Sequence, residues 1–380
     1  MSKRLRGALA LSAVFALAVV AAGCGSSNDN STSSSGGSGG GGTIALLLPE
    51  NQTPRYEAAD RPYFEDKVQA ICPDCKILYS NATQDAAKQQ SQAEAALTQG
   101  IDVMVLGPVD ATAAAGIVTK AAQQNVPVVS YDRLILDAPI DYYTSFDNEQ
   151  VGRLQATSLT KKLTQDGHPK GPIIMINGDP ADSNAALFKK GAHSVFDSNG
   201  MDIAKEYDTP GWLGSNAQNE AQQAITALGN NGFWGVYGAN DDMAGGAIAA
   251  MKSAGIDPAT RPSTGQDATA AGIQRILAGQ QYMTVYKAVK PEASAAAEMA
   301  VALAQGKTPD LGQIASSEGN GGRSEQLDNG QGQIPSIIFT PVAVTKDNVK
   351  STVIADQYVK ASEVCVGPYV SACKAAGISP

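Results

Sequence analysis

Histidine, excess basic charge and long apolar runs are all scarce in this sequence. It contains two histidines, His168 and His193, too few for a zinc site that combines cysteine and histidine ligands. Its 37 acidic residues outnumber its 28 lysines and arginines, and the net charge of −9 argues against nucleic-acid binding, which needs clustered basic residues. Beyond the N-terminal segment, no apolar run approaches the ~20 residues that span a bilayer. What remains is an acidic globular chain with 43% hydrophobic residues, an ordinary proportion for a packed core.

The N-terminal segment has the parts of a secretory signal peptide. Lys3, Arg4 and Arg6 precede a short apolar run over residues 8–22, and small residues follow that run. The run is too short to span a bilayer. Residues 1–23 are therefore predicted to be removed on export, and the rest of the chain is expected outside the cytoplasm.

Cys24 directly follows these small residues, and this arrangement resembles a bacterial lipoprotein signal. The resemblance implies that Cys24 is acylated after cleavage and anchors the protein to the cell membrane. Ala21 stands where such signals more often carry leucine, and an ordinary signal peptide with a cysteine nearby by chance is the alternative. Residues 25–42 contain no apolar side chain, so residues 24–42 are predicted to be a flexible Gly/Ser linker.

Four further cysteines fit an oxidising compartment: Cys72, Cys75, Cys365 and Cys373. Four thiols allow three connectivities, and we favour the two local disulfides, Cys72–Cys75 and Cys365–Cys373. A redox centre or half of a zinc site is the alternative for the first pair. The redox interpretation requires a strand before the motif and a helix after it, whereas here the order is reversed.

From Thr43 onward, strand-like and helix-like segments alternate. Several strand-like segments are continuous apolar runs, which is typical of strands buried on both faces of a parallel sheet. The expected strands are Ile44–Leu48, Lys76–Tyr79, Val103–Leu106, Val126–Ser130, Ile173–Ile176, Ile203–Tyr207, Trp234–Tyr237, Thr284–Tyr286 and Ser336–Phe339. The helical segments between them indicate βαβ units, and so many units favour two parallel sheets over one. An eight-fold barrel is the alternative, but the polar, irregular segment 309–335 would interrupt its repeat.

Hydrogen-bonding side chains are dense where these strands end, and in open parallel sheets ligands bind at the carboxyl ends of the strands. These side chains are Asp132, Arg133, Asp147, Asn148, Asp179, Asp182, Asn184, Asn240, Asp241, Gln266, Asp267 and Lys287. Capping of the following helix is an equally good interpretation for Asp147, Asp182 or Asp241 taken singly. Arg133 and Lys287 cannot cap a helix N-terminus, so the repeated pattern favours a binding site.

These residue types suit a sugar. Its hydroxyls both donate and accept, so Asp, Asn and Arg side chains can bind them in pairs. Sugar rings also have apolar faces that pack on aromatic side chains. Trp212 lies in a turn-rich loop after a strand and is a candidate for such stacking, with a role at the edge of the core as the alternative. Trp234 lies in an expected strand and is predicted to be core.

Several segments, in order along the chain, resemble the periplasmic sugar-binding proteins of ABC importers, D-xylose binders first and multi-sugar (glucose/galactose) binders next. They are Val129–Ile135, Ser145–Gly152, Gly265–Ala268, Thr284–Lys287 and Thr340–Val344, within a resemblance that runs from Thr43 to about Gln357. The resemblance implies the type I periplasmic binding protein fold, in which two Rossmann-like α/β lobes are joined by three hinge crossovers. The crossovers are expected near Phe146, Tyr286 and Phe339.

The implied domains are an N-terminal lobe of residues 43–146 plus 288–338 and a C-terminal lobe of residues 147–287 plus 339–380. The segment Ser316–Gln333 is longer than expected in the family, and its role stays open.

The sugar site of the family can be carried over onto matching positions. The implied ligands are Arg55, Tyr56, Asp132, Arg133, Asp182, Asn184, Trp212, Asn240, Asp267 and Lys287. Tyr56 stands where the xylose binders have tryptophan, and Ser183 replaces the middle asparagine of an Asp-Asn-Asn segment.

The resemblance implies a monomeric, extracytoplasmic protein that closes on a monosaccharide and delivers it to the membrane subunits of an ABC permease. The alternatives are a multi-sugar receptor that presents the sugar to a sensor kinase, and a secreted sugar-acting enzyme. No cofactor, metal or catalytic residue is expected: Gly306-Lys307-Thr308 resembles the end of a P-loop, but Val301 occupies the position of its first glycine. LacI-type repressors share these lobes but begin with a DNA-binding motif in place of a signal peptide.

Overall fold

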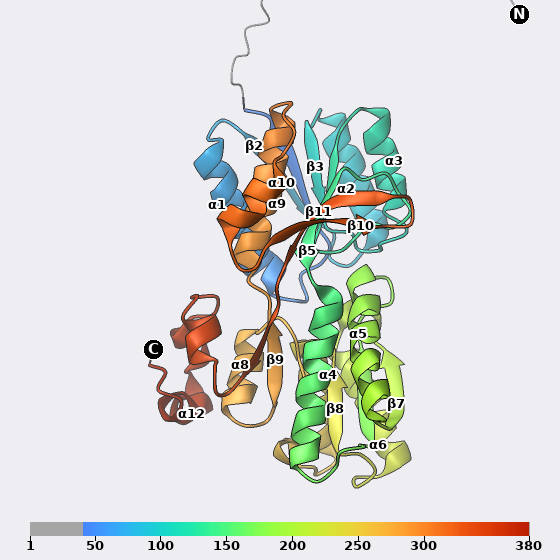
Figure 1. The fold of residues 1–380 in the computed structure, drawn as a ribbon, viewed down its shortest axis with the longest axis vertical. Helices are drawn as coiled ribbons and strands as arrows, with labels where there is room; N and C mark the ends of the chain where they lie inside the picture. The colour runs from blue at the N-terminus through green and yellow to red at the C-terminus, as the bar shows by residue number, and fades with distance from the viewer. Residues whose placement is uncertain (1–40, 380) are drawn as a thin grey trace, which may run out of the picture. The chain divides into compact units, whose positions relative to one another are not determined.

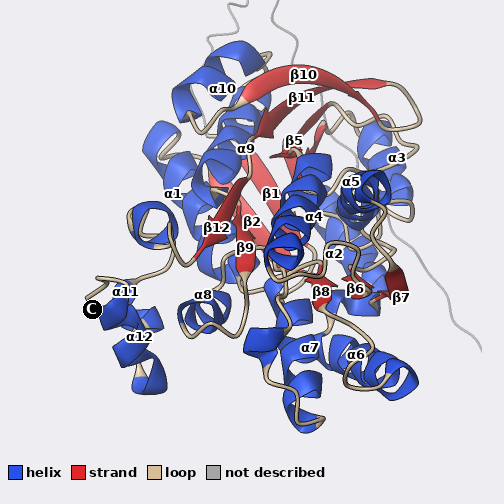
Figure 2. Ribbon diagram, turned by 60° about the horizontal axis from the view of Figure 1, so that its bottom comes forward, coloured by secondary structure: helices blue, strands red, loops and turns tan. Residues whose placement is uncertain are grey.

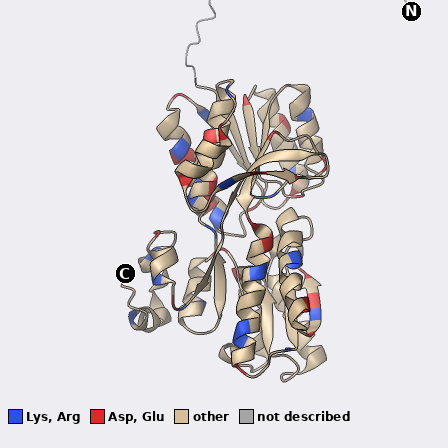
Figure 3. Cartoon of the chain, in the orientation of Figure 1, with Lys and Arg blue, Asp and Glu red and all other residues tan. Residues whose placement is uncertain are grey.

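The structure is a computed structural model that describes residues 41–379. The predicted signal peptide, the lipidation site Cys24 and linker residues 24–40 lie outside these described residues. Within residues 41–379, no helix combines the length and the apolar character that a membrane span requires. Basic and acidic residues are interspersed over the described chain (Figure 3).

A sheet of seven strands, in the order β10-β11-β5-β4-β3-β1-β2, forms the centre of a first lobe (Figure 1). Its strands are β1 (Thr43–Leu48), β2 (Lys76–Asn81), β3 (Val103–Leu106), β4 (Val128–Tyr131), β5 (Tyr142–Phe146), β10 (Arg323–Asp328) and β11 (Gln333–Phe339). β10 pairs antiparallel with β11, and the other pairs of this sheet are parallel.

Helices cover both faces of this sheet, because successive side chains of a strand point to opposite faces. Ile44, Leu46 and Leu48 of β1 pack with α1 (Arg61–Ile71), α9 (Val289–Ala304) and α10 (Leu311–Glu318). The alternate residues Ala45 and Leu47 pack with α2 (Ala86–Thr98) and α3 (Ala115–Gln123) on the other face. This doubly covered sheet explains why the strands are continuous apolar runs.

The second lobe contains two smaller sheets with the strand orders β7-β6-β8 and β12-β9. Its strands are β6 (Ile173–Asn177), β7 (Ile203–Asp208), β8 (Gly235–Gly238), β9 (Met283–Tyr286) and β12 (Val342–Thr345). The extended segment 263–267 lies between the two sheets: the Thr264 amide donates to the Val236 carbonyl at 3.1 Å, and the Asp267 amide donates to the Val285 carbonyl at 2.8 Å.

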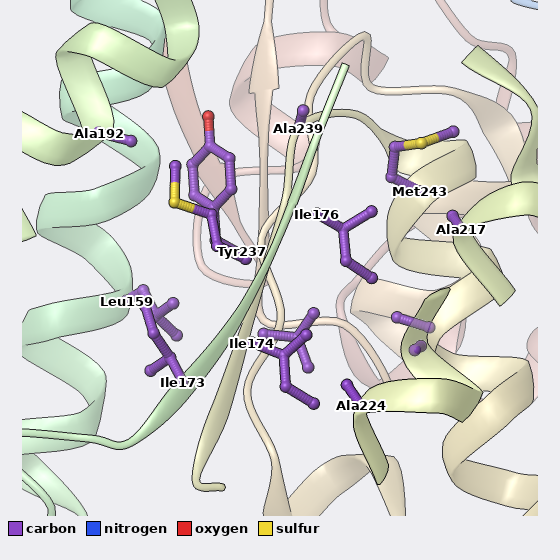
Figure 4. Packing of buried hydrophobic residues seen from close by; sticks show 14 of the residues in the cluster. Leu159, Ile173, Ile174, Ile176, Ala192, Ala217, Ala224, Tyr237, Ala239 and Met243 are labelled. Atoms are coloured by element: carbon purple, nitrogen blue, oxygen red, sulfur yellow. The ribbon is translucent and has the colours of Figure 1, made fainter. Parts of the chain in front are cut away.

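Helices also cover this lobe, and Figure 2 shows them around its strands. They are α4 (Asn148–Gln165), α5 (Ser183–Asn199), α6 (Gly214–Leu228), α7 (Asp241–Ser253) and α8 (Ala270–Leu277), with the short α11 (Ala361–Val364) and α12 (Val370–Ala375) near the C-terminus. Figure 4 shows the core between them, where Leu159 of α4, Ile174 of β6 and Met243 of α7 are fully buried.

The chain crosses between the lobes three times: from β5 into α4, from β9 into α9 and from β11 into β12. The expected two-lobed α/β class is therefore confirmed. The exact residue limits of the lobes stay a prediction.

The segment 309–335 is not irregular as expected, because it contains α10 and β10. Its sequence has no apolar run because β10 is an edge strand, and its residues Arg323 to Asp328 are exposed or only half-buried. Charged side chains on an edge strand are a usual protection against pairing with other chains. β12 was also missed. Trp234 directly precedes β8 and is half-buried: it packs against the edge of the second-lobe core and stacks on His168 with 3.5 Å between ring centroids.

Two disulfides are present in the described chain. Cys72 is bonded to Cys75 between α1 and β2, and Cys365 is bonded to Cys373 between α11 and α12. These are the local pairs favoured in the sequence analysis.

Candidate functional site

The predicted ligand residues line one pocket at the carboxyl ends of the strands of both lobes. The lining residues are Thr53, Arg55, Tyr56, Asp132, Arg133, Asp182, Asn184, Phe188, Trp212, Asn240, Gln266, Asp267 and Lys287. Every residue carried over from the sequence as a sugar ligand is in this set. Their role as ligands stays a proposal.

Arg55 is held in a buried network of carboxylates. It lies at the start of a short π-helix (Tyr56–Asp60), and its Nε and Nη2 atoms donate to both oxygens of Asp60 at 3.0 and 2.6 Å. Nη2 also donates to Glu292 at 2.7 Å, and Nη1 donates to Asp132 Oδ1 at 3.2 Å. Two parallel hydrogen bonds to one carboxylate fix the orientation of the guanidinium group, which also lines the pocket.

Asp132 is the carboxylate at the centre of the first-lobe side of the pocket. Besides Arg55, it accepts a hydrogen bond of 2.6 Å from the hydroxyl of Tyr56. Burial would raise the pKa of Asp132, but the charges of Arg55 and Lys287 outweigh burial and lower this pKa to about 2. Asp132 is therefore ionised at any physiological pH.

Direct contacts join the two lobes across the pocket. Arg133 Nε lies 2.9 Å from Asp182 Oδ2, and both side chains are almost fully buried. The side-chain amide nitrogen of Asn184 donates to the backbone carbonyl of Asp132 at 3.0 Å. Burial raises the pKa of Asp182, and the nearby charge of Arg133 opposes this rise.

Aromatic rings and a lysine complete the second-lobe side. The indole nitrogen of Trp212 donates to Asp182 at 3.1 Å, and its ring meets Phe188 edge-on with 6.3 Å between centroids. Lys287 Nζ lies 3.4 Å from Asp267 Oδ1 and 5.8 Å from the ring centroid of Phe188.

Two glycines make this arrangement possible. A Cβ at Gly178 would lie 2.0 Å from the Trp212 ring, and a Cβ at Gly152 of α4 would lie 1.9 Å from the Phe188 carbonyl oxygen of α5. Larger residues at either position would push the Trp212 loop or helix α5 away from its place.

The helix-cap interpretation and the pocket interpretation both hold for two residues. The Asp182 side chain accepts from the backbone N–H of Asn184 at 2.8 Å and caps α5. The Asn240 side chain accepts from the backbone N–H of Met243 at 2.9 Å and caps α7. Asp147 caps α4 and Asp241 is bonded to Gln281 and Thr269, and neither lines the pocket.

Sequence reasoning missed three lining residues as ligands: Thr53, Phe188 and Gln266. Gln266 precedes Asp267 in a segment that was recognised, and Phe188 lies one helical turn after Asn184. Each therefore had a weak local signal. Thr53 had none, because only the fold brings its loop to the pocket.

The pocket is balanced in charge. Among its lining residues, Arg55, Arg133 and Lys287 face Asp132, Asp182 and Asp267. A neutral ligand with many hydroxyls fits such a lining, whereas a charged ligand would leave one charge unpaired. No group of histidine, cysteine and acidic residues within residues 41–379 is arranged to hold a metal ion.

The chain belongs to the periplasmic binding protein family, whose domain model matches residues 44–308. This membership confirms the expected type I fold and the resemblance on which the site was predicted.

Several relatives of this chain are named as sugar-binding proteins. The chain is 38% identical over 309 residues to the D-xylose-binding periplasmic protein of Escherichia coli, an alignment that covers 80% of this chain and 87% of that protein. It is 32% identical over 298 residues to the multiple sugar-binding periplasmic receptor ChvE of Rhizobium radiobacter, covering 74% and 81%. A carbohydrate transporter solute-binding protein of Chloroflexus aurantiacus, solved in complex with D-glucose, has a TM-score of 0.71 at 28% identity and covers 84% of this chain and 97% of its own.

Asp242, in the first turn of α7, has a strongly raised pKa, which makes the stability of the protein depend on pH. Burial first, and then the charges of Asp241 and Asp267, raise its pKa to about 7, against the opposing charge of Arg275. Because this pKa is raised on folding, the protonated carboxyl is favoured in the folded protein. The free energy of unfolding therefore has its full value, as far as Asp242 is concerned, below pH ~4, and it falls as the pH rises through 7.

Asp242→Asn is therefore expected to raise the free energy of unfolding at pH 8 by up to about 4 kcal/mol and to change it little at pH 4. Urea unfolding at the two pH values measures this difference. The exposed carboxylate of Asp66 provides the control Asp66→Asn. An equal effect of Asp242→Asn at both pH values would contradict the prediction.

Proposed function

We propose that this protein captures a monosaccharide, D-xylose in preference, between its lobes and delivers it to an ABC permease. The observation that supports this most is the pocket itself. Three carboxylates there balance three cationic side chains, neutral amides lie among them, and the rings of Trp212, Phe188 and Tyr56 also line the pocket. The D-xylose-binding relatives favour xylose, and the multi-sugar relatives keep glucose and galactose as alternatives.

Binding requires the lobes to move apart. The pocket has a volume of about 20 Å³, which is room for little more than one water molecule. A sugar ring must therefore replace direct contacts such as Arg133–Asp182 and Asn184–Asp132. The hydroxyls of the sugar then take over the hydrogen bonds of these side chains, so that ligand and lobe closure stabilise each other.

We further propose that the protein acts outside the cytoplasm as a monomer, held at the membrane by a lipid on Cys24. The relative of Rhizobium radiobacter is a receptor, so presentation of the sugar to a sensor kinase is the second candidate. A sugar-acting enzyme is disfavoured, because the pocket carboxylates Asp132, Asp182 and Asp267 are each already paired with a cationic side chain.

Calorimetric titration with D-xylose, D-glucose, D-galactose, L-arabinose and D-ribose tests the ligand. We expect micromolar or tighter binding of D-xylose and weaker binding of the others. Tight binding of several aldoses would indicate a multi-sugar receptor, and binding of none would overturn the proposed function.

The same titration tests the residues. Arg133→Ala and Asp267→Ala are each expected to lower sugar affinity at least tenfold, about 1.4 kcal/mol, because each removes a side chain that would hydrogen-bond to the sugar hydroxyls. Arg153→Ala is the matched control, since Arg153 forms a surface ion pair with Glu149 outside the pocket. Wild-type affinity in both pocket variants would remove these residues from the site.

The anchor is tested by Cys24→Ser. We expect this change to move the protein from the membrane fraction to the soluble fraction of a bacterial host, without loss of sugar binding. A variant that stays in the membrane fraction would show that the anchor, if present, is not the lipid on Cys24.

A further inference from the structure

Glu292 is a fully buried carboxyl group behind the first-lobe side of the pocket. It lies in the first turn of α9, which begins directly after the crossover from β9 (Figure 1). It is not among the residues that line the pocket, but its Oε2 atom accepts from Nη2 of the lining residue Arg55 at 2.7 Å. Sequence reasoning missed it because the contact joins residues 237 positions apart.

Three carboxyl groups share the guanidinium group of Arg55. Asp60 accepts from Nε and Nη2, Asp132 accepts from Nη1, and Glu292 accepts from Nη2. Lys287 also faces this group, but it forms its ion pair with a different carboxylate. These side chains are all buried, and three negative charges around one cation in the interior would be poorly compensated. One of the three carboxyl groups is therefore expected to hold a proton.

Hydrogen bonding indicates that Glu292 is the group that holds it. Asp60 accepts three hydrogen bonds, two from Arg55 and one of 2.5 Å from the hydroxyl of Tyr131. Both oxygens of Asp132 also accept. Glu292 accepts only one, and its Oε1 atom has no hydrogen-bond partner among the described residues. An unpaired oxygen in the interior costs much more in a carboxylate than in a neutral carboxyl group, so the neutral form belongs to Glu292.

The surroundings of Glu292 agree with this assignment. Burial raises its pKa well above the usual range, the charge of Arg55 opposes this rise, and neighbouring carboxylates add to it. The titratable and charged groups that face it are Arg55 and Asp60 at the π-helix, Tyr131 and Asp132 at the end of β4, Tyr143 of β5 and Lys287 after β9. Helix α1 also packs on α9, but its Lys67 is paired with Glu298 and Glu318.

Glu292 also determines which donor of Arg55 stays available. A guanidinium group has five N–H groups. Asp60 takes that of Nε and one of Nη2, Glu292 takes the other one of Nη2, and Asp132 takes one of Nη1. Within residues 41–379, the N–H left over is therefore on Nη1, the atom that faces the pocket residue Asp132.

We propose that Glu292 is a positioning residue of the sugar site, which as a neutral carboxyl group holds Arg55 so that one Nη1 donor points to the sugar. A neutral acceptor fixes the guanidinium group through a weaker hydrogen bond than an ionised one, so the charge of Arg55 stays available to Asp132 and to the sugar hydroxyls. The positioning role rests on the proposed function, whereas the protonation of Glu292 does not.

The protonation is tested without sugar, by the infrared spectrum of the wild-type protein at pH 7 minus that of Glu292→Gln. We expect this difference to contain the carbonyl band of one neutral carboxyl group. The control is Glu298→Gln on the same helix, which removes a carboxylate paired with Lys67 and should give the bands of an ionised group. Ionised-carboxylate bands in the Glu292→Gln difference would overturn the proposal.

The positioning role is tested by calorimetry with the sugar that the wild-type protein binds best. Glu292→Leu removes the acceptor for Arg55 and is expected to raise Kd at least tenfold, and Glu292→Gln, whose amide oxygen still accepts, should recover most of this loss. A merely structural role would lower the fraction of protein that binds and leave Kd unchanged, and that result would overturn the proposal. Glu292→Met replaces Glu292→Leu if circular dichroism shows that the latter is unfolded.

A double-mutant cycle tests whether Glu292 acts through Arg55. In an Arg55→Ala background, Glu292→Leu is expected to change Kd less than twofold, because the group that it positions is gone. Saturation-transfer NMR of the sugar measures these weaker affinities. A tenfold effect in both backgrounds would overturn the positioning role. If none of the five sugars binds the wild-type protein, the proposed function fails and the positioning role with it, whereas the infrared difference still decides the protonation of Glu292.

Discussion

The buried charge of Asp132 is the constraint on which the site depends. A carboxylate removed from water is stable only if cations and hydrogen-bond donors surround it, and Arg55, Tyr56 and Lys287 provide them. Asp60 and Glu292 in turn fix Arg55, so a chain of buried ion pairs orients the side chains on the first-lobe side of the pocket. The side chains on the first-lobe side of the pocket are therefore held in place by their own contacts, before any contact with the second lobe is made.

The second lobe meets this rigid side through groups that also serve the local structure. Asp182 and Asn240 cap helices and line the pocket with the same side chains, so their positions are set by backbone geometry. Three pocket residues adopt positive φ, Asp132 at 59°, Trp212 at 55° and Asp267 at 78°. Such backbone costs free energy that the surrounding packing offsets, and it is typical of positions that serve binding.

Most of the fold and much of the site could be predicted, and the failures have identifiable causes. The buried strands were visible because strands covered on both faces are apolar throughout, whereas β10 was missed because an edge strand is polar. Trp234 was misplaced because apolar content alone does not distinguish a strand from the turn before it. The sequence did not decide whether Asp182 caps a helix or lines a binding site, because its side chain does both. The sugar specificity stays open, since one hydroxymethyl group separates pentose from hexose and residue types alone do not determine such a difference.

The sequence by itself determined the α/β class, the alternation of strands and helices, the crowding of polar residues at strand ends and the family to which the chain belongs. These follow from short-range periodicity and motifs, which are written in consecutive residues. Only the tertiary structure decided that Thr53 and Phe188 reach the pocket and that Arg133 meets Asp182 across the lobes. These contacts join residues far apart in the chain, and their formation depends on how two independently packed lobes come together.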